Sequence, residues 1–184
     1  MPPASPTAVN VVSFPAYIAI KGQRQGQFKA EAATAQRRDK WIPILAFTQG
    51  VISPRDSASG LPTGRRQHQP ITIVKQRGAA SPQGLTACAT NEVLAEVAIE
   101  FIKMTPNANE TVYQTVKLTD ASISQIARVT GHADGSEDTP TSGHSGPSNM
   151  LDYERWSFTF RRIEVHDNDG DTTFADEVTA GAVT

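Results

Sequence analysis

The side chains best placed for chemistry form a basic run, Arg65-Arg66-Gln67-His68, which closes a polar segment and precedes an alternating apolar stretch. Two guanidinium groups side by side could bind a phosphate. No glycine-rich phosphate loop, metal-ligand spacing or nucleophile elbow accompanies them. A merely solvated loop is the plainer alternative, and a polar contact in an assembly is the interpretation that we prefer.

A second candidate is the acidic run at residues 167–171, DNDGD, which looks like part of a calcium-binding loop. An EF-hand loop needs its glycine one place after the third acidic ligand and a glutamate at its twelfth position. Thr172 and Val178 occupy these two places. Asn168-Asp169-Gly170 is instead typical of a hairpin turn, so we expect a turn here and no metal.

The remaining reactive side chains show no catalytic arrangement. His68, His132, His144 and His166 lack the spacing of metal ligands. Cys88 falls on the apolar side of a predicted helix without a neighbouring base, which favours an inert, buried thiol. Serine, histidine and aspartate are scattered without a nucleophile elbow. We therefore predict a protein that is not an enzyme and carries no cofactor.

Length and composition limit the function further. The chain has 184 residues, 38% of them apolar, and a net charge of −2. This is enough for one domain with a core, and it offers no basic field for nucleic acid. The single cysteine fits a reducing compartment. No apolar run approaches the roughly 20 residues of a membrane-spanning helix, so we expect no membrane insertion.

Residues 1–15 contain four prolines and lack the basic and apolar regions of a secretory signal. They are interpreted as a flexible leader before one domain at 16–176, and residues 177–184 as a tail. The segment Thr130–Asn149 is small, polar and rich in Gly and Pro, which predicts a mobile loop.

Alternating apolar residues predict short strands along most of the domain. The expected strands are 16–21, 27–33, 41–47, 71–75, 111–119, 156–160 and 163–165. The alternation changes phase near Asp120 and at Arg161-Arg162, which predicts a bulge at the first of these places. Residues 93–104 fit a helix and a strand almost equally, and their β-branched residues favour a strand.

One helix is expected from residue 81, with Ser81 as N-cap and Pro82 at the first helical position. Leu85, Cys88 and Ala89 would then form its apolar stripe. The whole pattern predicts a mainly antiparallel β protein with one short α-helix, and a closed or nearly closed barrel fits so many short strands.

The stretch Trp41–Phe47 is apolar on both faces of a predicted strand, and Pro43 gives it an edge or bulged position. Such a strand is buried on both sides or half-covered by a neighbouring subunit. We therefore predict a subunit interface at Trp41, Ile42 and Ile44.

The run Gly64-Arg65-Arg66-Gln67-His68-Gln69-Pro70 resembles the haemolysin-coregulated protein family, the inner-tube proteins of bacterial type VI secretion. Further pieces in matching order are 17–22, 53–56, 80–82, 115–121 and 158–165. The run after the basic motif, Val74-Lys75-Gln76, departs from the family pattern. The leader and the loop at 130–149 are also longer than usual.

The resemblance implies an antiparallel β-barrel that assembles as a hexameric ring and a strand at 93–104. Rings would stack into a tube inside a contractile sheath and leave the cell beneath a spike protein, with secreted effectors in the lumen. The protein would be made in the bacterial cytoplasm and exported without a cleaved signal. A contractile phage tail-tube protein and a ligand-binding β-barrel are the alternatives.

The resemblance also assigns site residues. It places Thr48 in the lumen, in contact with effectors. We expect the long polar loop to join ring to ring through its charged and polar side chains, which are Arg55, Asp56, Arg65, Arg66, Gln67 and His68.

Overall fold

The computed structural model describes residues 16–30, 40–104, 110–132 and 150–178. Within these ranges the chain forms strands and one helix, as the sequence predicts. The elements are β1 (Ala16–Gly22), β2 (Gly26–Gln27), β3 (Ile42–Ile44), β4 (Ala46–Thr48), β5 (Val51–Ile52), β6 (Gln67–His68), β7 (Ile71–Gln76), α1 (Ser81–Ala89), β8 (Leu94–Met104), β9 (Glu110–His132), β10 (Met150–Thr159), β11 (Arg162–Asp167) and β12 (Thr172–Glu177).

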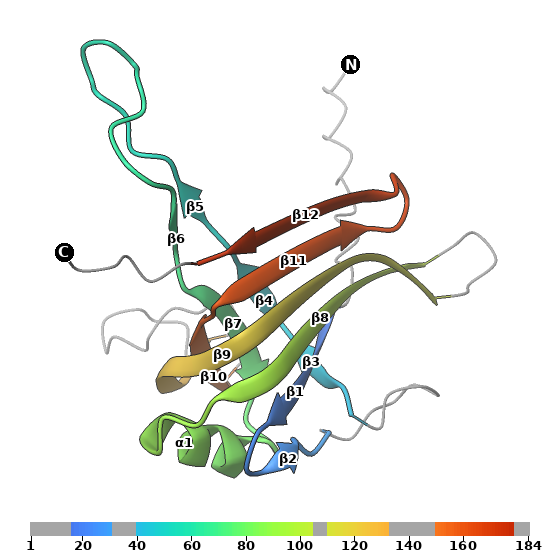
Figure 1. The fold of residues 1–184 in the computed structure, drawn as a ribbon. Helices are drawn as coiled ribbons and strands as arrows, with labels where there is room; N and C mark the ends of the chain where they lie inside the picture. The colour runs from blue at the N-terminus through green and yellow to red at the C-terminus, as the bar shows by residue number, and fades with distance from the viewer. Residues whose placement is uncertain (1–15, 31–39, 105–109, 133–149, 179–184) are drawn as a thin grey trace, which may run out of the picture.

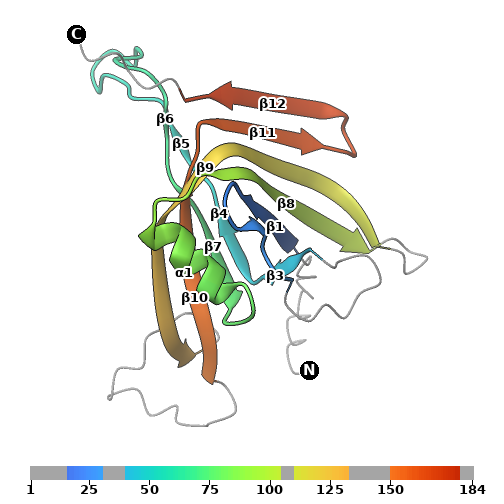
Figure 2. The same cartoon turned by 60° about the horizontal axis from the view of Figure 1, so that its bottom comes forward.

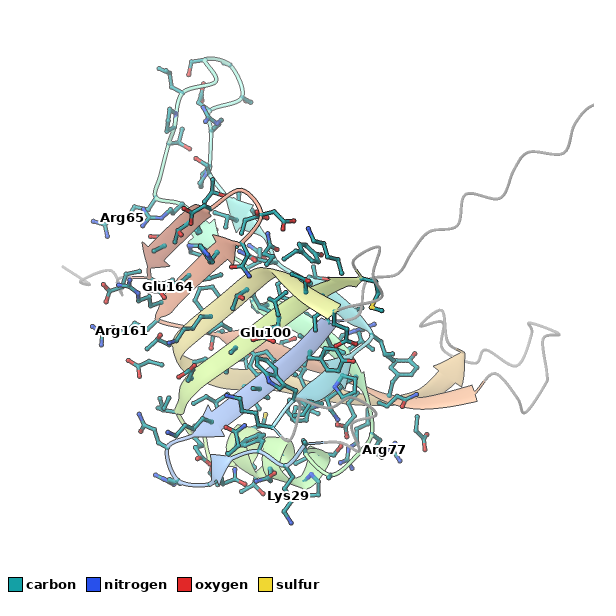
Figure 3. The ribbon with its side chains drawn as sticks, turned by 90° about the vertical axis from the view of Figure 1, so that its right-hand side faces the viewer. Lys29, Arg65, Arg77, Glu100, Arg161 and Glu164 are labelled. Carbon is teal, nitrogen blue, oxygen red and sulfur yellow. The ribbon has the colours of Figure 1, made fainter. Side chains whose placement is uncertain are left out.

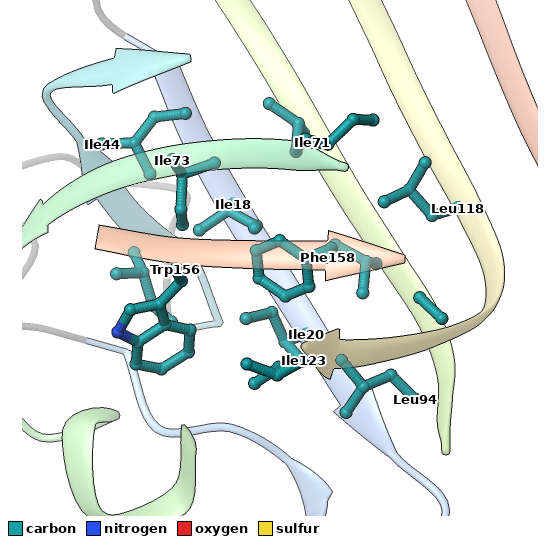
Figure 4. Close-up of a cluster of buried hydrophobic side chains, with 14 of the residues drawn as sticks. Ile18, Ile20, Ile44, Ile71, Ile73, Leu94, Leu118, Ile123, Trp156 and Phe158 are labelled. Atoms are coloured by element: carbon teal, nitrogen blue, oxygen red, sulfur yellow. The ribbon is translucent and has the colours of Figure 1, made fainter. Parts of the chain in front are cut away.

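Ten strands form one antiparallel sheet, and seven of them lie in the order β2-β1-β8-β9-β10-β7-β4. In addition β3 pairs with β1, β11 pairs with β9, and β12 pairs with β11, while β5 and β6 form a separate ribbon. The sheet folds over so that buried side chains from β1, β7, β9 and β10 meet between its two halves (Figure 4). This core contains Ile18, Ile20, Ile71, Ile73, Leu118, Ile123, Trp156 and Phe158.

The long strand β9 links the two halves of the sheet (Figure 1). Its first part pairs with β11 as far as Thr119, and its second part pairs with β10 from Ser122 onward. Asp120 lies between the two parts with a φ of 49°. The buried set shifts there from Val116 and Leu118 to Ala121 and Ile123. The change of phase that the sequence shows near Asp120 is therefore the corner between the two halves.

The two-faced stretch Trp41–Phe47 is broken at Leu45 rather than forming one strand. β3 pairs with β1 in one half of the sheet and β4 pairs with β7 in the other. Ile42 is fully buried and Ile44 and Trp41 are each 8% exposed, whereas Leu45 is 56% exposed. The change of sheet explains why both faces are apolar. The side chain of Ile42 packs into the protomer's own core, and a subunit interface at Trp41, Ile42 and Ile44 stays a prediction.

Helix α1 begins at Ser81, but its N-cap is Ala80, which makes no side-chain cap. The predicted role of Ser81 as N-cap is therefore wrong. The hydroxyl of Ser81 donates to Glu154 instead, at 2.8 Å. The buried residues of the helix are Ser81, Gly84 and Ala87, not the predicted stripe. The helix uses this face because glycine at position 84 lets the backbone approach the ring of Trp156.

Several predicted boundaries differ from the structure. β2 ends at Gln27, β8 confirms the strand after the helix, and β9 runs on to His132, so residues 130–132 are strand rather than loop. The turn between β11 and β12 confirms the predicted hairpin, with Gly170 N–H donating to Asp167 Oδ1 at 2.8 Å. The leader at 1–15 and residues 133–149 and 179–184 lie outside the described residues. No helix in the described ranges is long and apolar enough to cross a membrane.

Candidate assembly surface

The basic run lies at the base of a hairpin that projects from the body of the molecule, opposite α1 (Figure 1). We call residues 51–68 the arm. Its two sides are joined by the β5–β6 pairing, Val51 with His68 and Ile52 with Gln67, and by one isolated bridge between Arg55 and Pro62. At the base, Gln69 N–H donates to Gly50 O at 2.9 Å.

The tip of the arm is held by its own side chains. Asp56 Oδ1 accepts hydrogen bonds from the backbone N–H groups of Ser59 at 2.7 Å and Ala58 at 3.1 Å. The bonds from Ser59 and then Ala58 lower the pKa of the Asp56 carboxyl. Arg55 Nη1 donates to Gly60 O at 3.1 Å, and Gly60 has a φ of 70° that favours glycine. Arg55 and Asp56 thus shape the turn rather than standing free.

The base of the arm is fixed by a carboxylate on β12. The guanidinium of Arg66 donates through Nε and Nη2 to the two oxygens of Asp176, and His68 Nε2 lies 2.8 Å from Asp176 Oδ2. The side chains of His68 and Asp176 are only 6% and 7% exposed, whereas that of Arg66 is 55% exposed. We call these three residues the latch. Figure 2 shows the β11–β12 hairpin beside the base of the arm.

The contacts of the latch shift the pKa values of Asp176 and Arg66 in opposite directions. The hydrogen bond from Arg66 and then that from His68 hold the pKa of Asp176 well below its usual range. The same pairing raises the pKa of Arg66. The ring of His68 also packs edge-on against Phe160, with centroids 5.4 Å apart. The carboxylate is therefore ionised at all ordinary pH values, and the bidentate pair fixes the orientation of Arg66.

Asp176 was missed from the sequence because it sits in an ordinary short strand. The structure shows that Asp176 occupies an inward position, because its cross-strand neighbour Ile163 is fully buried. A carboxylate at such an inward position needs partners.

The other predicted loop residues stay exposed. Gln67 and Arg65 are exposed, and Figure 3 shows Arg65 pointing away from the body on the side of Glu164 and Arg161. Apolar side chains accompany them, because Val51 is 45%, Ile52 49% and Leu61 65% exposed. The free surface of the arm is thus more apolar than the sequence suggested.

Thr48 lies exposed on β4 and continues a row of small polar residues across the sheet. Cross-strand neighbours in this row are Thr48, Thr72, Ser157 and Gln125, one from each of β4, β7, β10 and β9. The hydroxyl oxygens of Thr72 and Ser157 are 3.2 Å apart. None of these side chains is buried. The row carries no charged side chain on this face of the sheet.

A second polar cluster, which the sequence analysis did not identify, is enclosed between α1 and the sheet. Glu154 is fully buried and accepts hydrogen bonds from Ser81, Trp156 Nε1 at 3.1 Å and Arg128 Nε at 2.9 Å. The ammonium of Lys75, also fully buried, lies 3.6 Å from Glu154 Oε2. These contacts join α1 to β7, β9 and β10, so the cluster holds the helix against the sheet.

Within the described ranges no three His, Cys, Asp or Glu residues are arranged to hold a metal ion. Cys88 is half-buried and packs partly against the core. The features that stand out are therefore surfaces: the arm with its latch, and the polar row around Thr48.

Comparison with known proteins agrees with this picture. The model of a family described as "Type VI secretion system effector, Hcp" matches residues 17–166. The "Major exported protein" of Pseudomonas aeruginosa is 35% identical over 120 residues, which cover 61% of this chain and 70% of that protein.

Solved structures show the same fold. A structure described as "Crystal structure of Hcp protein" has a TM-score of 0.77 at 21% identity, covering 90% of this chain and all of that one. The secreted protein Hcp3 from Pseudomonas aeruginosa has a TM-score of 0.68 at 24% identity, covering 91% of this chain and all of that one.

Proposed function

Since the chain belongs to the haemolysin-coregulated protein family, the tube proteins of type VI secretion, we propose that its folded sheet closes into a barrel and that six copies form a ring. The observation that carries this proposal is the family match over residues 17–166, most of the domain. The segment β3–β4 supports barrel closure, because β3 pairs with β1 on one side of the sheet and β4 pairs with β7 on the other.

The ring is tested by light scattering after gel filtration. The expected mass is about six times the 19.8 kDa of the protomer, as for a closed cyclic oligomer. A monomer at micromolar concentration contradicts the proposal. A role for Trp41 and Ile44 at the ring interface remains a prediction, which a loss of rings in the variant Trp41→Ala would support.

We propose that the arm joins one ring to the next. Its exposed side chains support this role, because Arg65, Val51, Ile52 and Leu61 are all solvent-exposed in the protomer. The contact would combine apolar burial with charge, rather than charge alone. Stacked rings would form the tube inside a contractile sheath, under a spike protein.

The variant Leu61→Glu tests the arm. It removes the most exposed apolar side chain of the arm tip, and we expect intact rings that no longer form tubes in electron micrographs. Leu85→Glu is the matched control, since Leu85 is exposed on α1, away from the arm. Tubes in both variants, or loss of rings with Leu61→Glu, contradict the assignment.

We propose further that Thr48 and the polar row beside it line the lumen and contact effectors, which leave the cell with the tube. The row supports a contact with cargo, because its side chains carry no charge and none of them is buried. Thr48→Glu should lower the retention of a bound effector while rings persist. Thr173→Glu, an exposed threonine on β12, is the control; equal retention by both variants removes Thr48 from the contact.

A further inference from the structure

The arm has few ties to the body of the molecule. Among the described residues, the hydrogen bonds that link arm side chains to the rest of the chain all end on the carboxylate of Asp176. The other hydrogen bonds of the arm are internal, such as those of Asp56 and Arg55 at its tip. A two-stranded ribbon is marginally stable alone, so its shape and direction depend on what anchors it.

The anchor joins segments that are far apart in the sequence. Arg66 and Asp176 are separated by 110 residues, and His68 and Asp176 by 108. Arg66 and His68 lie two residues apart on an extended chain, so both side chains point to the same face. A bidentate guanidinium pair adds geometric specificity, and His68 adds a second contact to the same carboxylate.

We propose that Asp176 is a positioning residue that sets the direction of the arm relative to the β11–β12 hairpin. With the latch closed, the arm and the hairpin move as one body. Without the carboxylate, the arm swings about its base while the folded sheet persists. The inference deepens the proposed stacking role of the arm and rests on it only for its effect on tubes.

The first experiment measures the arm itself. Spin labels are attached at Ala58→Cys on the arm and Ala89→Cys at the end of α1, both exposed positions, in a Cys88→Ser background. Labelled protein is diluted with unlabelled protein so that pairs within one protomer dominate. Pulsed electron spin resonance then gives the distance distribution between arm and body.

Asp176→Asn is the test variant, because it keeps the shape and removes the charge. Asp169→Asn is the matched control, since Asp169 lies in the same hairpin and pairs with Lys103 on the surface, away from the arm. We expect a narrow distribution for the parent and for Asp169→Asn, and a broad one for Asp176→Asn with unchanged circular dichroism. A narrow distribution for Asp176→Asn overturns the proposal.

A second variant tests the proposal in case Asp176→Asn does not fold. Arg66→Gln removes a side chain that is more than half exposed, so the core is untouched. It should also broaden the distribution, and a narrow one again overturns the proposal.

Electron microscopy of the same variants separates the two proposals. Rings without tubes, together with a loose arm, support both. A loose arm with normal tubes leaves the latch standing and refutes the role of the arm in stacking.

Discussion

Glu154→Gln should destabilise the protomer more than any single substitution on its surface. The carboxylate of Glu154 is fully buried and is met by Ser81, Trp156, Arg128 and Lys75. Glutamine keeps the shape, but its amide group presents N–H where an oxygen had accepted hydrogen bonds. The buried ammonium of Lys75 also loses its carboxylate.

The magnitude follows from these contacts. Breaking one partner of a buried ion pair costs about 3 to 5 kcal/mol. Arg128 adds little, because its side chain is 40% exposed and water replaces part of its pairing. The reverse change, Lys75→Met, leaves Glu154 with three donors and should cost only about 1 kcal/mol. Glu154→Gln therefore removes a large part of the roughly 5 to 15 kcal/mol that stabilise a domain.

Urea denaturation followed by tryptophan fluorescence measures both variants, because Trp156 lies in the cluster. Protein concentration is held fixed, since assembly stabilises the folded state by mass action. The expected order is parent, then Lys75→Met, then Glu154→Gln. If Lys75→Met costs as much as Glu154→Gln, the carboxylate is not the centre of the cluster.

Three more outcomes follow from single contacts. Gly84→Ala should lower stability by about 1 to 3 kcal/mol despite the better helix propensity of alanine, because its Cβ would lie 2.2 Å from Trp156 Cη2. Gly64→Ala is the control and should be near neutral, because no atom lies closer than 3.8 Å to the added Cβ. Equal urea midpoints for the two variants would contradict this prediction. Cys88 should react with a thiol reagent more slowly in the folded protein than after unfolding, and equal rates would place it outside the core. The pKa of Asp176 is lower in the folded protein than in the unfolded chain, where it is about 3.9. Its stabilising effect is therefore present above the unfolded pKa and is lost only as pH falls through the lower native pKa. The distance distribution between the arm and the body should accordingly stay narrow at pH 4.

Most strand segments and the presence of one helix could be predicted, because local alternation marks the strands and Ser81-Pro82 marks the start of the helix. The phase change near Asp120 appears in the sequence as a shift from Val116 and Leu118 to Ala121 and Ile123, and the structure turns the strand at that point. The stretch around Leu45 shows the limit of this reasoning. Alternation shows that both faces are apolar, but it cannot tell a subunit interface from a strand that crosses between two halves of a sheet.

The latch and the buried cluster could not be predicted in the same way, because each joins residues that are far apart in the sequence. Asp176 meets His68 across 108 residues, and Ser81 meets Glu154 across 73. The helix face was misjudged for a related reason. Glycine at 84 looks neutral in a hydrophobic pattern, yet its missing side chain is what lets the helix pack on Trp156.

The basic run Arg65-Arg66-Gln67-His68 therefore has two faces with different surroundings. On an extended chain, side chains two residues apart share a face, so Arg66 and His68 turn together toward Asp176 while Arg65 and Gln67 face solvent. Reversing the charge of both arginines at once would mix a lost internal anchor with a lost external contact. Substitution of Arg65 alone tests the external contact of the arm, and substitution of Arg66 alone tests the direction of the arm. A run that looks like one basic patch in the sequence thus contacts Asp176 with one face and exposes Arg65 and Gln67 to solvent on the other.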